Sequence, residues 1–260
     1  MTYTMNRQRA VQEIRDRLAA GGQSIGSWMQ IPHASVAEIM GQAGFEWVAI
    51  DLEHGAVSVS QLPDLFRALE LGGTLPMARL AQGHPKDCKE ALDAGAGGVI
   101  VPMVESAEQL VAVRDWCRWP PAGVRGVGFS RANLFGRHFD AYRDEAQAPL
   151  LVAMIEHTRA VGNLGAILDV PGLDAVLVGP YDLSASMGLT GQFEHPEFRA
   201  AMEGIRTQAL ERRVPCGVHV VAPSPDELRR RIGEGYRFLA YSIDAVFLVA
   251  ATKNVSQGMR

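Results

Sequence analysis

The sequence predicts a single (β/α)₈ barrel. Eight short β-rich runs alternate with helical patterns along almost the whole chain. The runs are apolar on both faces, which is typical of parallel strands covered by helices. A chain of 260 residues fits one such domain, because this fold typically occupies about 250 residues. An open doubly wound sheet is the alternative, and it is disfavoured because no GxGxxG motif follows the first run.

The eight expected strands are Ser24 to Ile31, Trp47 to Leu52, Leu75 to Leu80, Val99 to Met103, Leu150 to Glu156, Ala175 to Gly179, Cys216 to Val221 and Phe238 to Ile243. Helical patterns lie between them, and several end with glycine after the last apolar position, as helix C-termini do. These helices are Ser35 to Gly44, Ser60 to Leu71, Pro85 to Ala94, Ala107 to Cys117, Arg159 to Leu168, Pro196 to Arg213 and Pro225 to Gly235.

Two segments depart from this alternation, although all of residues 1–260 are expected to form one domain. Met5 to Ala20 mixes charged with apolar residues, so residues 1–22 are expected to carry an N-terminal amphipathic helix, not a signal peptide. Pro120 to Gly136 is rich in proline and glycine. Long loops in compact domains are often functional, and a surface insertion without a role is the alternative.

Composition excludes several classes of protein. The net charge is −4 and the basic residues are scattered, so a nucleic-acid groove is not expected. The longest apolar runs, Leu150 to Ile155 and Ala245 to Ala251, fall short of the roughly 18 residues that span a membrane. Cys88, Cys117 and Cys216 lack CxxC spacing, which argues against disulfides and thiolate zinc sites. The expected location is the cytoplasm.

Polar residues follow four of the expected strands, at the end of the barrel where this fold carries active sites. They lie in Asp51-Leu52-Glu53-His54, Ala78-Arg79, Ile155-Glu156-His157 and Gly179-Pro180-Tyr181-Asp182. Buried charges need a partner, water or a ligand.

Glu156 and Asp182 are 26 residues apart, which is one strand–helix unit. They are therefore expected at the ends of neighbouring strands roughly 4.8 Å apart. Two carboxylates so placed repel each other, and a hard cation such as Mg²⁺ or Mn²⁺ would join them. The alternative is that each caps the following helix or pairs with an arginine. Asp182 precedes Leu-Ser-Ala and is a plausible N-cap.

Arg79 and His54 are the other candidates for chemistry. A guanidinium at a strand end suits bidentate capture of a carboxylate or an enolate oxygen. A structural pair of Arg79 with Asp51 or Glu53 is the alternative. His54 could act as a general base near neutral pH, or it could be an ordinary loop histidine.

Lysine usage excludes one mechanism. The chain contains only Lys86, Lys89 and Lys253, and none lies on an expected strand. A Schiff base needs a buried amine aimed at the substrate carbonyl. For a carbonyl substrate, polarisation by a metal is the remaining route.

Four segments together carry a resemblance to a known family. They are Gly26-Ser27-Trp28, Trp47 to His54, Arg125-Gly126-Val127-Gly128 and Gly179 to Gly188. The sequence resembles the HpcH/HpaI family of metal-dependent pyruvate aldolases, collinearly from about Gly26 to Ala245.

The resemblance implies a (β/α)₈ barrel in which Glu156 and Asp182 bind a divalent cation, Mg²⁺, Mn²⁺ or Co²⁺. Arg79 would hold pyruvate or its enolate. His54, supported by Asp93, would serve acid/base chemistry through a metal-bound water. The implied activity is cleavage or formation of 4-hydroxy-2-oxo acids from pyruvate and an aldehyde.

The resemblance also implies substrate-binding roles for Trp28, Gly179 and Tyr181, next to the pyruvate ligand Arg79. The small-molecule partners would be a 2-oxo acid and an aldehyde. The family further implies a homo-oligomer, a hexamer built as a trimer of dimers. In these dimers the last helix is exchanged, here the Asp244 to Asn254 segment within the C-terminal helix and tail, residues 244–260.

Two other functions are consistent with these residues. A citrate-synthase-like condensation of oxaloacetate with an acetyl thioester uses the same enolate logic, and a non-catalytic barrel is a third possibility. His219 stands on the seventh expected strand, where aldolases of this family tend to be apolar. It either lies in the barrel mouth and changes the choice of aldehyde, or it is a hydrogen-bonded core residue.

Overall fold

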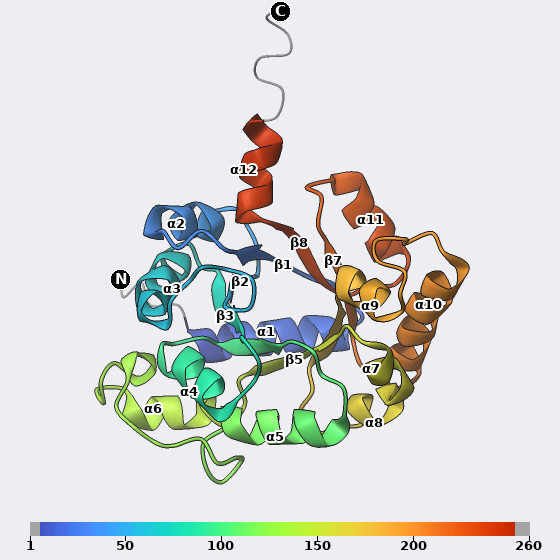
Figure 1. Ribbon diagram of the computed structural model, residues 1–260. Coiled ribbons are helices and arrows are strands. Elements are labelled where there is room, and N and C mark those ends of the chain that lie inside the picture. The colour runs from blue at the N-terminus through green and yellow to red at the C-terminus, as the bar shows by residue number, and fades with distance from the viewer. Residues whose placement is uncertain (1–5, 253–260) are drawn as a thin grey trace, which may run out of the picture.

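The computed structural model describes residues 6–252 and contains a closed barrel of eight parallel strands (Figure 1). Each strand pairs with its neighbours in sequence, and β1 pairs with β8 to close the ring. The strands are β1 (Ser24–Met29), β2 (Trp47–Asp51), β3 (Leu75–Arg79), β4 (Gly98–Val101), β5 (Leu150–Ile155), β6 (Ala175–Val178), β7 (Cys216–Val220) and β8 (Phe238–Ile243). The predicted barrel and its eight strands are confirmed.

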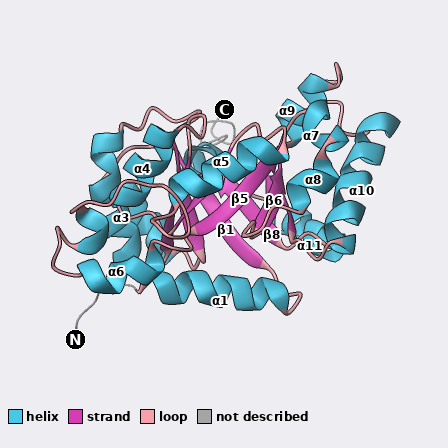
Figure 2. Ribbon diagram, turned by 90° about the horizontal axis from the view of Figure 1, so that it is seen from below, coloured by secondary structure: helices cyan, strands magenta, loops and turns pink. Residues whose placement is uncertain are grey.

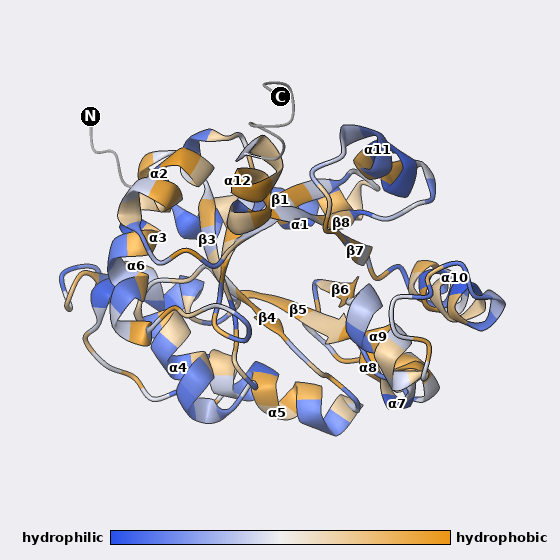
Figure 3. Cartoon of the chain, turned by 45° about the horizontal axis from the view of Figure 1, so that its top comes forward, coloured by the Kyte–Doolittle hydropathy of each residue, from blue (hydrophilic) through white to orange (hydrophobic). Residues whose placement is uncertain are grey.

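Helices surround the strands. They are α1 (Arg7–Ala19), α2 (Ala34–Gln42), α3 (Leu62–Leu71), α4 (Pro85–Asp93), α5 (Ala107–Cys117), α6 (Phe139–Glu145), α7 (Thr158–Gly162), α8 (Leu164–Leu168), α9 (Pro180–Ser186), α10 (Pro196–Glu211), α11 (Pro225–Gly233) and α12 (Asp244–Thr252). Figure 3 shows the expected contrast between apolar strands such as β4 and β5 and the hydrophilic α11 on the outside.

Two predicted features of the helices are wrong in detail. Arg159 to Leu168 was expected as one helix, but Asn163 adopts φ −102° and ψ 7°, which separates α7 from α8. The Gly162-Asn163 pair explains the break, since both residues disfavour a helix interior. Helix α9 entered the prediction only through Asp182 as its N-cap, without a range. The helix begins instead at Pro180, and proline is favoured at the first helical position.

The barrel interior is filled by a column of aromatic rings. Trp47 stacks on Phe238 with centroids 4.6 Å apart, and Trp28 meets Trp47 edge-on at 6.2 Å. His219 lies edge-on to Trp28 at 5.9 Å, at the mouth end of the column. Gly26 makes the column possible, because a Cβ there would lie 2.0 Å from the Trp47 ring.

Helix α1 closes the end of the barrel at which the strands begin. Its Val11, Ile14 and Leu18 are buried in the same cluster as the barrel interior. Figure 2 shows α1 lying across this end. The predicted N-terminal helix is thereby confirmed, and only the C-terminal ends of the strands remain open for a site.

The irregular insertion, residues 118–149, folds at the closed end of the barrel. It contains α6 and a small core of its own around Trp119 and Tyr142. Arg131 of the insertion donates to Glu70, which lies in the last turn of α3. It also donates to the carbonyl of Ala94, which directly follows α4. Because these helices run from the mouth toward the closed end, the insertion lies away from the carboxyl ends of the strands.

Helix α12 stands apart from the rest of the molecule and projects beyond the barrel (Figure 1). Phe247 packs against Phe45 and Tyr241 at its base, whereas Leu248 and Val249 are 58% and 65% exposed. The predicted C-terminal helix is present, although Asn254 lies outside the described residues. No helix within residues 6–252 is long and apolar enough to cross a membrane.

Candidate active site

Asp51 and Arg79 face each other across β2 and β3, where they are directly paired in the strand register. Asp51 is fully buried, and Arg79 is 7% exposed. Arg79 donates from Nε to Asp51 Oδ1 at 2.9 Å and from Nη2 to Oδ2. The structural pair considered from the sequence therefore exists. It does not use up the guanidinium, which has five N–H donors.

Asp51 organises the start of the following loop. Its Oδ1 accepts from the backbone N–H groups of Glu53 and His54, each at 3.1 Å, and its Oδ2 accepts from Gln30 at 2.8 Å. Burial alone would raise the pKa of Asp51, but the hydrogen bonds and charge of Arg79 outweigh it and hold the pKa below its usual range. Asp51 is thus a charged anchor that orients Arg79, Glu53 and His54.

Glu53 links the arginine to the histidine. Arg79 Nη1 lies 3.1 Å from Glu53 Oε2, and His54 Nε2 lies 3.8 Å from the same oxygen. Burial raises the pKa of Glu53, while the nearby charges of Arg79 and His54 oppose the rise. The His54 side chain is 55% exposed at the rim of the mouth. A proton acceptor at the rim therefore sits beside a carboxylate that would stabilise its charged form.

Glu156 follows β5 and is 2% exposed. Its Oε2 accepts a hydrogen bond from the backbone N–H of Met103 at 3.0 Å. Met103 holds φ 48°, in the left-handed region. Burial raises the pKa of Glu156 to about 7, and the negative charges of Glu53 and Asp182 add to the rise. The carboxylates of three different loops therefore share one electrostatic environment.

Gly179 leaves room for the other oxygen of Glu156. A Cβ at position 179 would lie 2.4 Å from Glu156 Oε1. Within the described residues no protein donor reaches that oxygen. Asp182 lies in the first turn of α9, exposed, but the N-cap of this helix is Gly179. The alternative prediction that Asp182 caps the helix is therefore wrong, and its carboxylate is free for another ligand.

The donor set at this edge suits a hard cation. In residues 6–252 no three His, Cys, Asp or Glu side chains form a ready-made metal site. Two carboxylates that follow neighbouring strands, one of them with an oxygen that accepts no protein hydrogen bond, are nonetheless the oxygen ligands that Mg²⁺ and Mn²⁺ prefer. Such ions commonly keep several waters and bind substrate oxygens in their remaining positions. The residues present therefore fit a divalent cation that is completed by water and substrate.

Comparison with known proteins agrees with this geometry. The family described as HpcH/HpaI aldolase/citrate lyase matches residues 24–251. The chain belongs to the HpcH/HpaI family. The match spans all eight strands and both carboxylates, and it confirms the resemblance read from the sequence.

Relatives in this family cover nearly the whole chain. A hydroxypyruvate/pyruvate aldolase from Roseobacter denitrificans is 36% identical over 244 residues, which is 92% of this chain and 93% of the relative. A 4-hydroxy-2-oxo-heptane-1,7-dioate aldolase from Salmonella paratyphi C is 35% identical over 236 residues, covering 90% and 89%. The crystal structure of a Burkholderia cenocepacia family member superposes with a TM-score of 0.88 at 30% identity, covering 95% and 98%.

One site residue implied by the HpcH/HpaI resemblance lies far from the other site residues in the folded chain. Asp93 is the last residue of α4, at the closed end of the barrel. Arg125 Nη1 of the insertion lies 3.6 Å from its carboxylate, and burial raises the Asp93 pKa against that charge. A single chain therefore does not bring Asp93 to His54, because the two occupy opposite ends of the barrel.

The expected substrate-binding residues lie around the mouth. The Arg79 guanidinium carbon is 4.7 Å from the centroid of the Trp28 ring, so Trp28 forms a floor beneath it. Tyr181 is 54% exposed and meets Phe193 edge-on at 4.9 Å. Gly179 lies against the Glu156 carboxylate, where a larger residue would not fit. These three residues come from β1 and from the segment after β6.

Sequence reasoning did not select Gln30 or the role of Asp51, and it left His219 undecided. Gln30 follows β1 and donates to Asp51, and His219 lies on β7 against Trp28. A polar residue ending or interrupting an apolar strand was the available signal for all three. Gln30 and Asp51 come from consecutive paired strands, whereas His219 and Trp28 are brought together only by closure of the ring.

Proposed function

We propose that this chain is a divalent-metal-dependent aldolase that cleaves or forms 4-hydroxy-2-oxo acids, with pyruvate enolate and an aldehyde as the two halves. It is a carbon–carbon lyase. The relatives named as aldolases of hydroxypyruvate, pyruvate and 4-hydroxy-2-oxo-heptane-1,7-dioate support the reaction class. The metal is Mg²⁺, Mn²⁺ or Co²⁺.

One observation carries this proposal. Glu156 keeps one carboxylate oxygen free in a space left by Gly179, beside the exposed Asp182 and close enough to feel its charge. Keeping such a buried charge without a partner is costly. A cation gives both carboxylates a counter-charge, and it would polarise the keto group of a bound 2-oxo acid.

The chain's own residues would supply binding and proton transfer. Arg79, held by Asp51 and backed by Trp28, presents its remaining N–H groups to the pyruvyl carboxylate or enolate oxygen. His54 takes the proton of the C4 hydroxyl. The electron pair that the O–H bond leaves on oxygen then forms the carbonyl bond to C4, the C3–C4 bond breaks, and its electron pair stays on pyruvate as the enolate. Glu53 stabilises the resulting imidazolium.

Assembly is part of the proposal. A homo-oligomer, a hexamer arranged as a trimer of dimers, would exchange α12 between copies, which the projection of this helix and its exposed Leu248 and Val249 support. Support of His54 by Asp93 would then require a second copy to bring Asp93 to the mouth. A cytoplasmic location is also proposed, supported by three buried, unpaired cysteines.

The test uses the full-length protein stripped of metal with a chelator. Deuterium exchange at the pyruvate methyl group should be lost without metal and restored by Mn²⁺ or Mg²⁺, and release of pyruvate from a 4-hydroxy-2-oxo acid should follow it. Full exchange and turnover in rigorously metal-free protein would remove the metal from the proposal. Thiol release from acetyl-CoA with oxaloacetate, in place of aldol cleavage, would favour the citrate-forming alternative.

A further inference from the structure

His219 lies where the barrel interior meets an open cavity. Its imidazole sits edge-on to Trp28, the ring that also lies under Arg79. It also lines a cavity of about 650 Å³ that extends from the barrel mouth between α10 and α11, with Tyr181, Val221 and Ala222 nearby in the lining. His219 and Arg79 thus flank the same indole, so His219 is close to the proposed pyruvate site.

The hydrogen bonding of His219 is incomplete. Its Nε2 is buried and has no hydrogen-bond partner among the described residues. A backbone group of Ser242 lies near the ring and favours its charged form. In the tautomer that carries its proton on Nδ1, the neutral ring offers a lone pair at Nε2.

The ring is neutral at ordinary pH. Burial lowers the pKa of His219 to about 4, and the positive charge of Arg79 lowers it further, against the opposing effects of Ser242 and Asp51. A buried acceptor without a donor costs free energy. The alternative of a hydrogen-bonded core histidine is therefore not met at Nε2, and this nitrogen is left for a ligand that donates.

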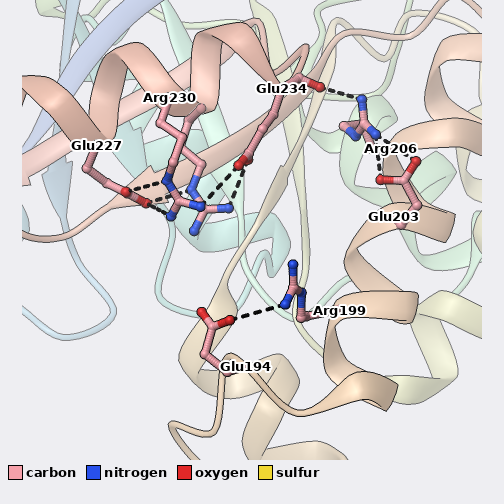
Figure 4. A network of polar contacts seen from close by, with 8 residues as sticks. Glu194, Arg199, Glu203, Arg206, Glu227, Arg230 and Glu234 are labelled. Atoms are coloured by element: carbon pink, nitrogen blue, oxygen red, sulfur yellow. Dashed lines mark hydrogen bonds and ion pairs between the residues drawn. The ribbon is translucent and has the colours of Figure 1, made fainter.

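The cavity beside His219 does not favour anions. Four arginines line it, and each is paired with a glutamate that also lines it, as Figure 4 shows for most of these pairs. The contacts include Arg199–Glu194 at 3.3 Å, Arg206–Glu203, Arg230–Glu227 at 2.7 Å and Arg231–Glu234 at 3.1 Å. The lining therefore leaves no uncompensated guanidinium within the described residues for the distal carboxylate of a dicarboxylic substrate.

We propose that His219 is a specificity-determining residue that accepts a hydrogen bond from a hydroxyl group of the aldehyde partner, and so selects short hydroxyaldehydes over deoxy or carboxylated ones. The inference rests on the proposed aldolase function and names the substrate class of its second half. A hydroxyl donates to Nε2, whereas a methyl group leaves Nε2 unpaired and a carboxylate places a negative charge against its lone pair. Because His219 and Arg79 lie against the same indole ring, a hydroxyl bound at Nε2 belongs to the aldehyde half that joins the pyruvyl group held by Arg79.

The experiment compares addition of pyruvate to glycolaldehyde and to acetaldehyde, which differ by one hydroxyl. Wild-type enzyme should prefer glycolaldehyde in kcat/KM and should use succinic semialdehyde poorly. His219→Phe keeps a ring against Trp28 but removes the acceptor, and it should lower the glycolaldehyde-to-acetaldehyde ratio by about tenfold. His219→Gln places an amide oxygen where it can accept, and it should recover most of the ratio.

A matched control and an independent readout keep the outcomes separate. His138→Phe, in the exposed part of the insertion at the far end of the barrel, should leave the ratio unchanged. Deuterium exchange at the pyruvate methyl group, measured on each preparation, gives the active fraction. An unchanged ratio in an exchanging His219→Phe enzyme overturns the inference and leaves the aldolase function intact.

Two further outcomes are also decisive. If His219→Phe does not fold, the other two enzymes still test the inference. It is overturned if the wild-type enzyme shows no preference for glycolaldehyde, or if the His219→Gln enzyme prefers acetaldehyde. If the metal-loaded wild-type enzyme shows no exchange at all, the proposed function fails instead.

Discussion

Gly179 and Glu156 are in a steric relationship that leaves no room for a side chain at position 179. A Cβ there would lie 2.4 Å from Glu156 Oε1 and 2.8 Å from its Cγ. Gly179 also follows β6 directly and serves as the N-cap of α9, so its backbone is fixed from both sides. The glycine therefore determines where the Glu156 carboxylate lies, because neither the strand nor the helix can move away.

Gly179→Ala should weaken binding of Mn²⁺ by about 10- to 100-fold, since changes that reorient a metal ligand typically cost that much. The methyl group would push Glu156 out of the position it shares with Asp182. Titration calorimetry with Mn²⁺ and the pyruvate exchange assay measure the two consequences. Gly162→Ala is the matched control, because a Cβ at that position meets no atom within 4 Å. Wild-type affinity in the Gly179 variant would contradict the proposed metal site.

Glu156 should make metal-free protein less stable at high pH. Its folded-state pKa is raised to about 7, mainly by burial. A raised carboxyl pKa gives stability that is complete below the unfolded value of about 4.3 and is lost as the pH rises through 7. The loss amounts to at most about 4 kcal/mol. Metal-free wild type should therefore lose stability between pH 5 and pH 8 in urea unfolding, and Glu156→Gln should lose less. Added Mn²⁺ should protect wild type more at pH 8 than at pH 5.

Asp51→Asn should destabilise the fold and misplace Arg79. Asp51 is fully buried and accepts hydrogen bonds from Gln30, Arg79 and two backbone N–H groups. Breaking a buried ion pair on one side costs about 3 to 5 kcal/mol. Because the Asp51 pKa is lowered, its contribution is present above about pH 4 and is lost as the pH falls further.

Urea unfolding of Asp51→Asn at several pH values measures this difference. The gap from wild type should be widest near pH 7 and should narrow toward pH 3. The exposed Asp64, which pairs with Arg67 within one helix, provides the control, since Asp64→Asn should change stability by about 0.5 kcal/mol or less. A gap that is constant with pH would mean that the charge of Asp51 contributes nothing.

The sequence predicted the barrel because its strands are fully buried and therefore uniformly apolar. Every strand was found to within a few residues. Glu156 directly follows β5, close to its expected place at the strand end, whereas Asp182 lies beyond β6, in the first turn of α9. The local signals failed where a partner comes from far along the chain. His219 meets Trp28 only because β8 closes onto β1.

The same reasoning explains why the sequence did not place Asp93 or the insertion at one end of the barrel or the other. A helix end carries no signal of which end of a barrel it occupies until the order of strands is known. Once β3 and β4 are paired, α4 must return to the closed end, and Asp93 goes with it. The proline- and glycine-rich insertion gave no pattern that separated a mouth loop from a segment packed against the far ends of α3 and α4.

His54→Ala should lower the rate of retro-aldol cleavage by about 10² to 10⁴ with little loss of stability. The side chain is half-exposed at the rim and contacts Glu53 at 3.8 Å, so its removal leaves no cavity in the core. Stopped assays of pyruvate release and thermal unfolding measure the two effects. His138→Ala at the opposite end of the barrel should leave both unchanged. A near-normal rate in His54→Ala would return His54 to a structural role.

Gly26→Ala should destabilise the barrel by about 3 kcal/mol or more, near the upper end of the cost of overpacking a core. The added Cβ would lie 2.0 Å from the Trp47 ring. That ring cannot retreat, because Phe238 stacks on it at 4.6 Å with planes 5° apart and Trp28 abuts its edge. Urea unfolding with Gly162→Ala as control measures the loss. If Gly26→Ala were as stable as wild type, the column of rings from Phe238 to His219 would have to shift freely. The fixed position of His219 beside Trp28 would then have no basis.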